Sequence, residues 1–280
     1  MEKFDNVKIV CLHTLFNENA LCLSNKYNIE YLVDFQPAPN HFYIIFGAHE
    51  RAVELLNIQM NQTFKFWYII LNSESQKSHL LRNKYYIELM KKNVVFNYSS
   101  GVADYLLETF DIKTYSYFFF DFMMSNLEEE RIYDYVFIGS PNENRLKQID
   151  ELKQAFPGKN IYVDFEGKYQ SASSMKQILS KTKWLLNIPF YENDSNLETH
   201  RIHNGLSCGC QVVSFKSGDT DTDDFYNDYI YFTDNLVDFF KSHEVKEKKK
   251  YTDLIRGLSA KWGTHNLFII KKINDKLMSC

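Results

Sequence analysis

The stretch KWLLNIPFYENDSNLETHRIHNGLSCGCQVVSF, residues 183–215, predicts a strand, a helix and a second strand in succession. Trp184–Ile188 and Gln211–Phe215 are short apolar runs of the kind that forms buried strands. Leu197–Ser207, between them, has helical spacing, and Asn196 is the expected N-cap. Because a strand–helix–strand connection usually joins parallel strands, this stretch predicts an α/β fold.

The same alternation extends in both directions from this stretch. The other expected strands are Val7–Leu12, Glu30–Phe35, Phe42–Phe46, Phe64–Leu71, Val94–Tyr98, Tyr115–Phe120, Tyr135–Ile138 and Asn160–Phe165. The other expected helices are Glu50–Met60, Leu80–Lys92, Val102–Phe110, Glu143–Phe156 and Ser173–Ser180. Several strands are apolar on both faces, which predicts doubly wound parallel sheets covered by helices.

The charged stretch Asn126–Arg131 (NLEEER) interrupts the alternation and predicts a domain boundary. We expect an N-terminal domain over residues 1–125, a C-terminal domain over 132–245, and a helical segment over 250–280 that packs back toward the N-terminal domain. This order predicts two Rossmann-like domains facing across a cleft, with ligands outside the carboxyl ends of the strands. The same organisation suits a periplasmic-type binding protein or a two-domain dehydrogenase, so function has to come from a site.

Composition excludes several classes of protein. The net charge of −4 over 280 residues argues against a protein held on nucleic acid by charge alone. The five cysteines form no CxxC pair and no zinc spacing, which is typical of reduced thiols in a cytoplasmic protein. The sequence begins without a signal-peptide pattern, and its apolar runs are far shorter than the ~20 residues that span a bilayer. We therefore expect a soluble, cytoplasmic protein without a transmembrane segment.

The helix expected over Leu197–Ser207 has the chemistry of an anion site. Glu198, Arg201 and Gly205 share one face of it. The free N–H groups of its first turn and Arg201 would balance a diphosphate, and Glu198 could accept hydrogen bonds from ribose hydroxyls. In the alternative interpretation the same residues have only a structural role. Glu198 then interacts favourably with the positive end of the helix dipole, Arg201 forms an ion pair with Glu198, and Gly209 ends the helix.

Several segments resemble GT-B glycosyltransferases. LETHRIHNGLSCGCQVVSF (197–215) resembles their donor-site signature, in which a glutamate opens a helix and a small-residue turn leads into a strand. YDYVFIGSPNENRLKQIDEL (133–152) looks like the opening of their C-terminal domain. KTKWLLNIPFYEN (181–193), WYIILNSESQ (67–76) and VVFNYSSGVADYL (94–106) are similar to segments of a bacterial and viral subgroup. The resemblance runs in order from about Trp67 to about Phe240.

The resemblance implies a hexosyltransferase-like enzyme that uses a UDP- or GDP-sugar. Glu198 matches the glutamate that binds donor ribose, and Arg145 and Arg201 match basic positions near the diphosphate. Gly139 and Ser140 match the loop whose backbone approaches the phosphates. Thr199 and His203, on the signature helix, complete the predicted donor-binding set.

The sequence departs from the family at one point. The first glutamate of the paired-glutamate motif has no secure match, since Glu192 stands six residues before Glu198 and that spacing is off by two. Retention or inversion of stereochemistry is therefore left open.

Two residues of the N-terminal domain are candidate catalytic groups. His13 follows the strand Val7–Leu12, where GT-B acceptors and bases often lie, and Glu74 follows the strand Phe64–Leu71 as a candidate general base. The alternative for each is a structural or solvent-facing role.

We expect no metal and no cofactor other than the nucleotide-sugar co-substrate. The acidic run Asp219–Asp224 could bind Mg²⁺ or Ca²⁺, but it lacks the EF-hand's glycine and distal glutamate and more simply caps a helix at Asp224–Tyr226. His200 and His203 lack an evident third ligand.

The leading prediction is therefore metal-independent transfer of a sugar from a nucleotide-diphosphate donor to a hydroxyl. The acceptor could be a glycan, a lipid-linked sugar, a protein or a hydroxymethylated DNA base, as in phage enzymes of this fold. Lys91, Lys92 and the cluster 246–250 could contact DNA phosphates, although the net negative charge places DNA second. A non-catalytic nucleotide-sugar binding protein is a further alternative. A Rossmann oxidoreductase is disfavoured because CLHTLFNENA stands where GxGxxG would follow the first strand.

Overall fold

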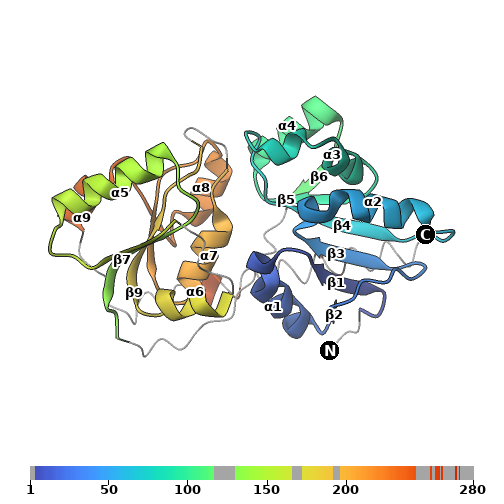
Figure 1. Ribbon diagram of the computed structural model, residues 1–280, viewed down its shortest axis with the longest axis horizontal. Helices are drawn as coiled ribbons and strands as arrows, with labels where there is room; N and C mark the ends of the chain where they lie inside the picture. Colours follow the sequence, from blue (N-terminus) through green and yellow to red (C-terminus); the bar gives the residue numbers. More distant parts are fainter. Residues whose placement is uncertain are drawn as a thin grey trace. The chain divides into compact units, whose positions relative to one another are not determined.

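The computed structural model describes residues 4–116, 130–165, 172–191 and 196–243, and individual residues between 253 and 271. The chain divides into two compact units, Met1–Asp121 with Lys261–Cys280, and Phe122–Ala260. Most of the expected boundary 126–131, Glu192 and the lysine cluster 246–250 lie outside the described residues. Each unit has its own parallel sheet (Figure 1).

The first unit contains a six-stranded parallel sheet in the order β2-β1-β3-β4-β5-β6. Its strands are β1 (Val7–Cys11), β2 (Glu30–Leu32), β3 (Phe42–Phe46), β4 (Trp67–Asn72), β5 (Val94–Asn97) and β6 (Thr114–Ser116). Its helices are α1 (Asn17–Tyr27), α2 (Ala52–Asn61), α3 (Lys84–Lys91) and α4 (Ser100–Phe110), with short 3-10 turns η1 (Thr14–Phe16), η2 (Ala48–Arg51) and η3 (His79–Arg82).

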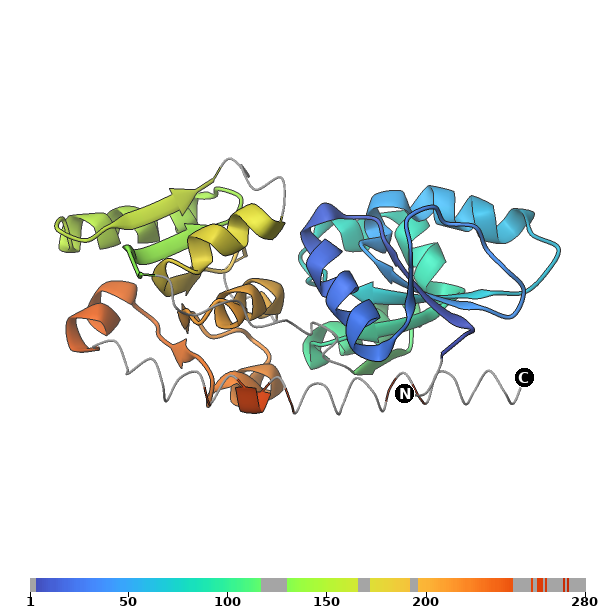
Figure 2. The ribbon, with the colours of Figure 1, turned by 90° about the horizontal axis from the view of Figure 1, so that it is seen from below.

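Alternate residues of these strands pack on opposite faces of the first sheet, because successive side chains of a strand point in opposite directions. Val10 and Ile45 belong to the core beneath α2, α3 and α4, whereas Ile9 and Ile44 belong to the core beneath α1 (Figure 1, Figure 2). Ile269 of the C-terminal segment is buried in this second core. This part of the segment thus packs with the N-terminal strands.

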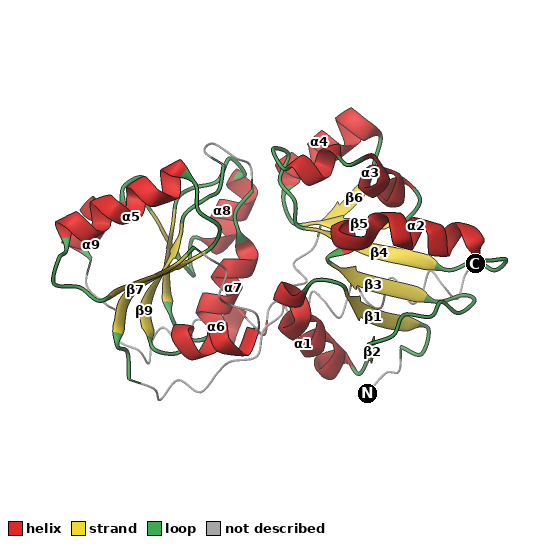
Figure 3. Cartoon of the chain, in the orientation of Figure 1, coloured by secondary structure: helices red, strands yellow, loops and turns green. Residues whose placement is uncertain are grey.

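The second unit contains a five-stranded parallel sheet in the order β11-β10-β9-β7-β8. Its strands are β7 (Tyr133–Ile138), β8 (Ile161–Asp164), β9 (Thr182–Asn187), β10 (Gln211–Ser214) and β11 (Tyr231–Phe232). Its helices are α5 (Glu143–Ala155), α6 (Ala172–Leu179), α7 (Thr199–Ser207), α8 (Thr220–Tyr226) and α9 (Leu236–Ser242). Helices α5 and α9 share one core cluster, and α6 and α7 cover the other face (Figure 3). The predicted α/β class with two doubly wound parallel sheets is confirmed.

Helix α7 lies unusually close to its sheet at Gly205. A Cβ atom at Gly205 would come within 2.4 Å of Leu185 Cδ2 and 3.2 Å of Val212 Cγ2. Glycine is therefore needed here for close approach to β9 and β10.

Two local predictions are wrong, and one helix was missed. Helix α7 begins at Thr199 with Glu198 at the N-cap, not Asn196. The acidic run is helical from Thr220, because the Asp219 side chain caps the helix by accepting from Thr222 N. Helix α1 was not expected from the sequence. Within the described part of the chain, no helix combines the length and apolarity that crossing a membrane requires.

Candidate functional site

The strand order reverses once in each sheet, and ligands of doubly wound folds bind where it does. In the second sheet the reversal falls between the neighbouring strands β7 and β9. Helix α5 begins shortly after β7, and α7 begins shortly after β9. Two helix N-termini, which favour anions, therefore follow the two strands at this switch point.

Arg145 lies in the first turn of α5, and only 3% of its side chain is exposed. The side chain of Asn142 caps this helix by accepting from Arg145 N at 2.8 Å. The guanidinium donates from Nε to the carbonyl of Ile188 at 3.0 Å and from Nη1 to that of Ser140 at 2.9 Å, and from Nη2 to a carboxylate oxygen of Glu198. Arg145 thus joins the loop after β7 to the loop after β9.

Arg201, on α7, reaches the same place from the other strand. Its Nε donates to the Ile138 carbonyl at 2.9 Å, and its Nη1 donates to Asn187 Oδ1 at 2.8 Å. A Cβ atom at Gly139 would lie 2.8 Å from Arg201 Nη2 and 3.3 Å from Arg145 Nη1. A side chain at position 139 would force the guanidinium group of Arg201 to shift.

Glu198 connects the two arginines, since its two carboxylate oxygens pair with Arg145 and Arg201 separately. Its side chain is 28% exposed, and Oε1 also accepts from Phe190 N at 3.1 Å. Burial, which outweighs the attraction of Glu198, lowers the pKa of Arg145 to about 10, so the guanidinium is charged at neutral pH. Arg145 and Arg201 carry two positive charges, and Glu198 carries one negative charge. One positive charge of this group is therefore left to attract a further anion.

The structure brings together most of the predicted donor residues. Gly139, Ser140, Arg145, Glu198 and Arg201 form one connected group at the switch point. Thr199, which was also predicted to bind the donor, directly follows Glu198 in the sequence. Its buried hydroxyl has no hydrogen-bond partner among the described residues.

His203 lies apart from the arginines. It is fully buried, and its Nε2 contacts the hydroxyl of Tyr226 on α8. As the structure stands, this side chain is not accessible to a ligand.

Two residues of the site were missed by sequence reasoning. Asn187 holds Arg201, and Asn142 positions Arg145 and donates to the Phe190 carbonyl. Asn142 was readable as an N-cap three residues before Arg145. The contact of Asn187 with Arg201 depends on packing between α7 and β9, which no local pattern reveals.

Carboxylates of the acidic run 219–224 accept hydrogen bonds from α8 and from the loop that precedes it. Asp219 accepts from Thr222 N, and the Asp223 carboxylate accepts from both the backbone N and the hydroxyl of Ser217. Burial raises the pKa of Asp223. The run thus caps a helix, as the sequence favoured, but the helix is Thr220–Tyr226 and its cap is Asp219.

In the first sheet the strand order reverses between β1 and β3, and both predicted catalytic residues lie near that end. His13 follows β1, and Glu74 follows β4. Between them stands His49, which sequence reasoning missed, with Nδ1 3.7 Å from Glu74 Oε1. Burial lowers the pKa of His13, and the neighbouring carboxylates of Glu50 and Glu74 offset this only in part.

Glu50 completes this group in the first unit. Its Oε1 lies 3.6 Å from His13 Nε2 and 3.4 Å from His49 Nε2. Glu74 is itself fixed by Ser78, whose hydroxyl donates to Glu74 Oε2 at 2.8 Å. The arrangement can orient an imidazole, exchange protons with a substrate hydroxyl, or bind a cation.

Comparisons with known proteins bear on the fold. No protein-family model and no curated protein matches the sequence. Among solved structures, an α-glucosyltransferase in complex with UDP-glucose and DNA containing an abasic site is similar at a TM-score of 0.52 and 11% identity, over 97% of this chain and 93% of that chain.

Two further solved structures are similar at lower scores. A DNA-modifying β-glucosyltransferase, studied with and without uridine diphosphoglucose, has a TM-score of 0.45 and 13% identity over 98% of this chain and 96% of that one. An α1,3-fucosyltransferase with GDP-fucose has a TM-score of 0.40 and 9% identity over 92% and 81%. These two scores are too low to add to the argument. At 11% identity the first likeness establishes the fold, which is the one that the GT-B resemblance implied.

Proposed function

We propose that this protein is a glycosyltransferase that takes a sugar from a UDP- or GDP-sugar. The observation that carries the proposal is the convergence of Arg145 and Arg201 on Glu198 at the switch point of the second sheet. Transfer releases a nucleoside diphosphate, so the enzyme has to stabilise growing negative charge on the leaving group. Two fixed guanidinium groups and two helix N-termini supply that stabilisation without a metal.

Different residues of this group bind different parts of the donor. Arg201 and the backbone of Gly139–Ser140 hold the diphosphate, while Arg145, which is almost fully buried, positions the loop and Glu198. Glu198 accepts hydrogen bonds from the ribose hydroxyls. A small hollow beside Glu198, lined also by Asn196, Ser214 and Lys216, gives the nucleoside an approach to that carboxylate.

The acceptor is a hydroxyl compound, and the first unit supplies the groups that receive its proton. His13 and Glu74 lie at the carboxyl edge of the first sheet, joined through His49. A hydroxymethylated DNA base is a second candidate acceptor beside a glycan, because the structure with a TM-score of 0.52 is of a glucosyltransferase bound to UDP-glucose and DNA. Loss of transfer as salt rises would favour DNA, since phosphate contacts weaken with ionic strength. Salt-independent transfer would favour a small glycan.

Release of nucleoside diphosphate from UDP-glucose and GDP-sugars, measured with wild-type protein and Glu198→Ala, tests the proposal. We expect slow donor hydrolysis by the wild type and at least a tenfold loss of UDP affinity in the variant. Inorganic pyrophosphate should still bind the variant, because both arginines remain. A wild type that binds UDP but never turns over a donor would instead identify a non-catalytic binding protein.

A further inference from the structure

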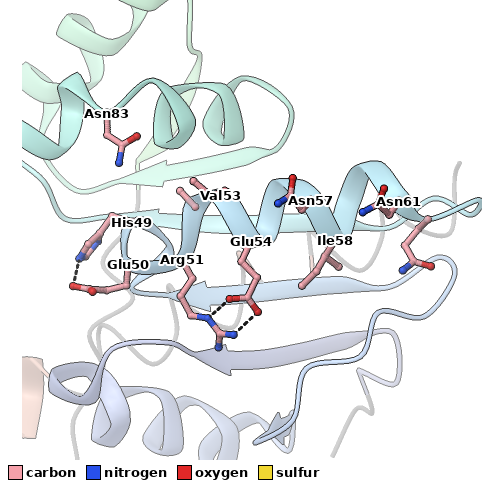
Figure 4. A pocket seen from close by; sticks show the side chains of 11 residues that line it. His49, Glu50, Arg51, Val53, Glu54, Asn57, Ile58, Asn61 and Asn83 are labelled. Carbon is pink, nitrogen blue, oxygen red and sulfur yellow. Dashed lines mark hydrogen bonds and ion pairs between the residues drawn. The ribbon is translucent and has the colours of Figure 1, made fainter.

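His13, His49 and Glu50 form a compact group at the switch point of the first sheet. Their ligand-capable atoms all lie within 4.8 Å of one another. Figure 4 shows His49 and Glu50 side by side at the start of the segment that leads into α2. Gly47 makes the approach of His13 possible, since its φ is +74° and a Cβ atom there would come within 2.5 Å of His13 Cβ. The two loops are thus packed together as tightly as a glycine allows.

Two of the distances within the group are longer than direct hydrogen bonds and close to those between ligands of one metal ion. His13 Nε2 and His49 Nε2 approach the same oxygen of Glu50, at 3.6 and 3.4 Å. Protein hydrogen bonds to nitrogen are shorter, at about 2.7–3.2 Å. Ligand atoms about 2.0–2.1 Å from a tetrahedral metal ion lie about 3.3 Å from one another. Each imidazole nitrogen thus lies from the Glu50 oxygen at nearly the spacing that a shared ion would set, and all three atoms lie within 4.8 Å of one another.

The second nitrogen of His49 has the partner that metal-binding histidines usually have. His49 Nδ1 lies 3.7 Å from Glu74 Oε1, which is longer than a direct hydrogen bond but places this carboxylate behind the imidazole, and Ser78 holds the other oxygen of Glu74. A carboxylate behind a ligating imidazole fixes its tautomer and orientation, which leaves Nε2 as the ligand.

We propose that His13, His49 and Glu50 bind a divalent transition-metal ion such as Zn²⁺, with Glu74 as the residue that positions His49. Two imidazoles and one carboxylate suit zinc, and three protein ligands leave a position for water or a substrate oxygen. His13 and Glu50 are 26% and 48% exposed, so that position faces solvent. A groove of about 600 Å³ extends from His49 and Glu50 along α2 toward Asn61. With the ion bound, His13 is a ligand, so the proton-accepting role given to His13 under the proposed function applies only to the metal-free protein.

The test is a titration of metal-free, full-length protein with Zn²⁺ against a chromophoric chelator, followed by Co²⁺ substitution. We expect one Zn²⁺ per chain and a Co²⁺ spectrum of nitrogen and oxygen ligands without thiolate bands. His49→Gln and Glu50→Gln should each weaken binding by at least 100-fold, and Glu74→Gln by about 10–100-fold. His79→Gln is the matched control, because His79 is exposed on the same unit and lies outside the group. Its affinity should equal that of the wild type.

Absence of stoichiometric zinc in the wild type would overturn the proposal, whatever the variants do. Equal affinity of the wild type and His49→Gln, with folding verified by circular dichroism, would also overturn it by placing the metal elsewhere. Zinc stoichiometry and zinc affinity are both measured without a nucleotide sugar. A protein that binds no zinc could therefore still be a glycosyltransferase, and a protein that transfers no sugar could still bind zinc.

Discussion

At the scale of single residues, Arg145 connects stability with the candidate function. Its guanidinium satisfies two backbone carbonyls and one carboxylate while almost completely removed from water. A buried charge is tolerated only when it is paired and hydrogen-bonded. Arg145 therefore holds the loops together, whereas Nη2 of Arg201 lies beside Gly139.

Replacing Arg145 with alanine should destabilise the protein by about 3–5 kcal/mol, because Glu198 loses one partner and the carbonyls of Ile188 and Ser140 lose their donor. Arg145→Lys should restore little of this, since a single ammonium group cannot reach the three partners. Urea unfolding measures both effects. Lys147→Ala, on an exposed position of the same helix, is the control and should change stability by less than about 0.5 kcal/mol. An unfolding free energy for Arg145→Ala equal to that of the control would contradict this account.

At the scale of helices and strands, close packing of α7 on the sheet places Glu198 and Arg201. The contact depends on Gly205, which faces Leu185 and Val212. The helix could otherwise not approach β9 closely enough for Arg201 to reach Asn187 and the Ile138 carbonyl.

Gly205→Ala should lower stability by about 1–3 kcal/mol, because the added methyl overpacks the interface. Gly257→Ala provides the opposite case, since Gly257 is helical and a Cβ atom there would meet nothing within 4 Å. Alanine there should raise stability by up to about 1 kcal/mol through helix propensity. Thermal unfolding of the two variants compares them directly, and a stabilised Gly205→Ala protein would refute the close approach of α7.

Asp134 fixes the beginning of three neighbouring strands of the second sheet. From β7 it accepts from Asn160 N at 2.9 Å, just before β8, and from Lys183 Nζ at 2.8 Å on β9. Burial raises the pKa of this carboxyl, but the hydrogen bonds and the charges of Lys183 and Lys159 outweigh burial and leave the pKa below its ordinary value of 3.8.

The contribution of Asp134 is thus present above about pH 4 and is lost as pH falls through the lowered pKa. Asp134→Asn should cost about 1 kcal/mol at pH 7, a value kept small because Lys183 is partly exposed. Denaturant unfolding from pH 7 to pH 2 should show the two proteins converge at the acidic end. A difference that stays constant across this range would rule out the ionised carboxylate as its source.

Most helices and strands could be predicted from the sequence. Which side chains come together at the two candidate sites could be predicted only in part. The strands appear as short apolar runs because they are buried on both faces, and β3 matches its predicted range. Helix α1 escaped prediction because NENALCLSNKY is rich in polar residues, although its buried residues, among them Ala20, Leu23 and Tyr27, recur at helical spacing. The Glu198–Arg201 pair follows from helical spacing, but His49 meets His13 and Glu74 only because β1, β3 and β4 are neighbours in the sheet.

At the scale of the whole molecule, the chain repeats one plan in two units with different chemistry. Each unit has a doubly wound parallel sheet with its own core and one reversal of strand order. The second unit gathers two arginines at its reversal, despite a net charge of −4 for the chain, and the first gathers histidines and carboxylates. An arginine-rich group and a histidine–carboxylate group thus occupy corresponding places in the two units, and the proposals assign them to donor binding and to proton or cation binding respectively.

The most direct test of the donor site is a thermal-unfolding panel with UDP, GDP, ADP, CMP and the corresponding nucleotide sugars. We predict that UDP or GDP raises the melting temperature by several degrees at saturation, because a ligand at about 100 times its Kd adds about 2.7 kcal/mol. The shift should be lost in Arg201→Lys and kept in Lys147→Ala. No shift with any nucleotide, in wild-type protein at millimolar ligand, would contradict the account.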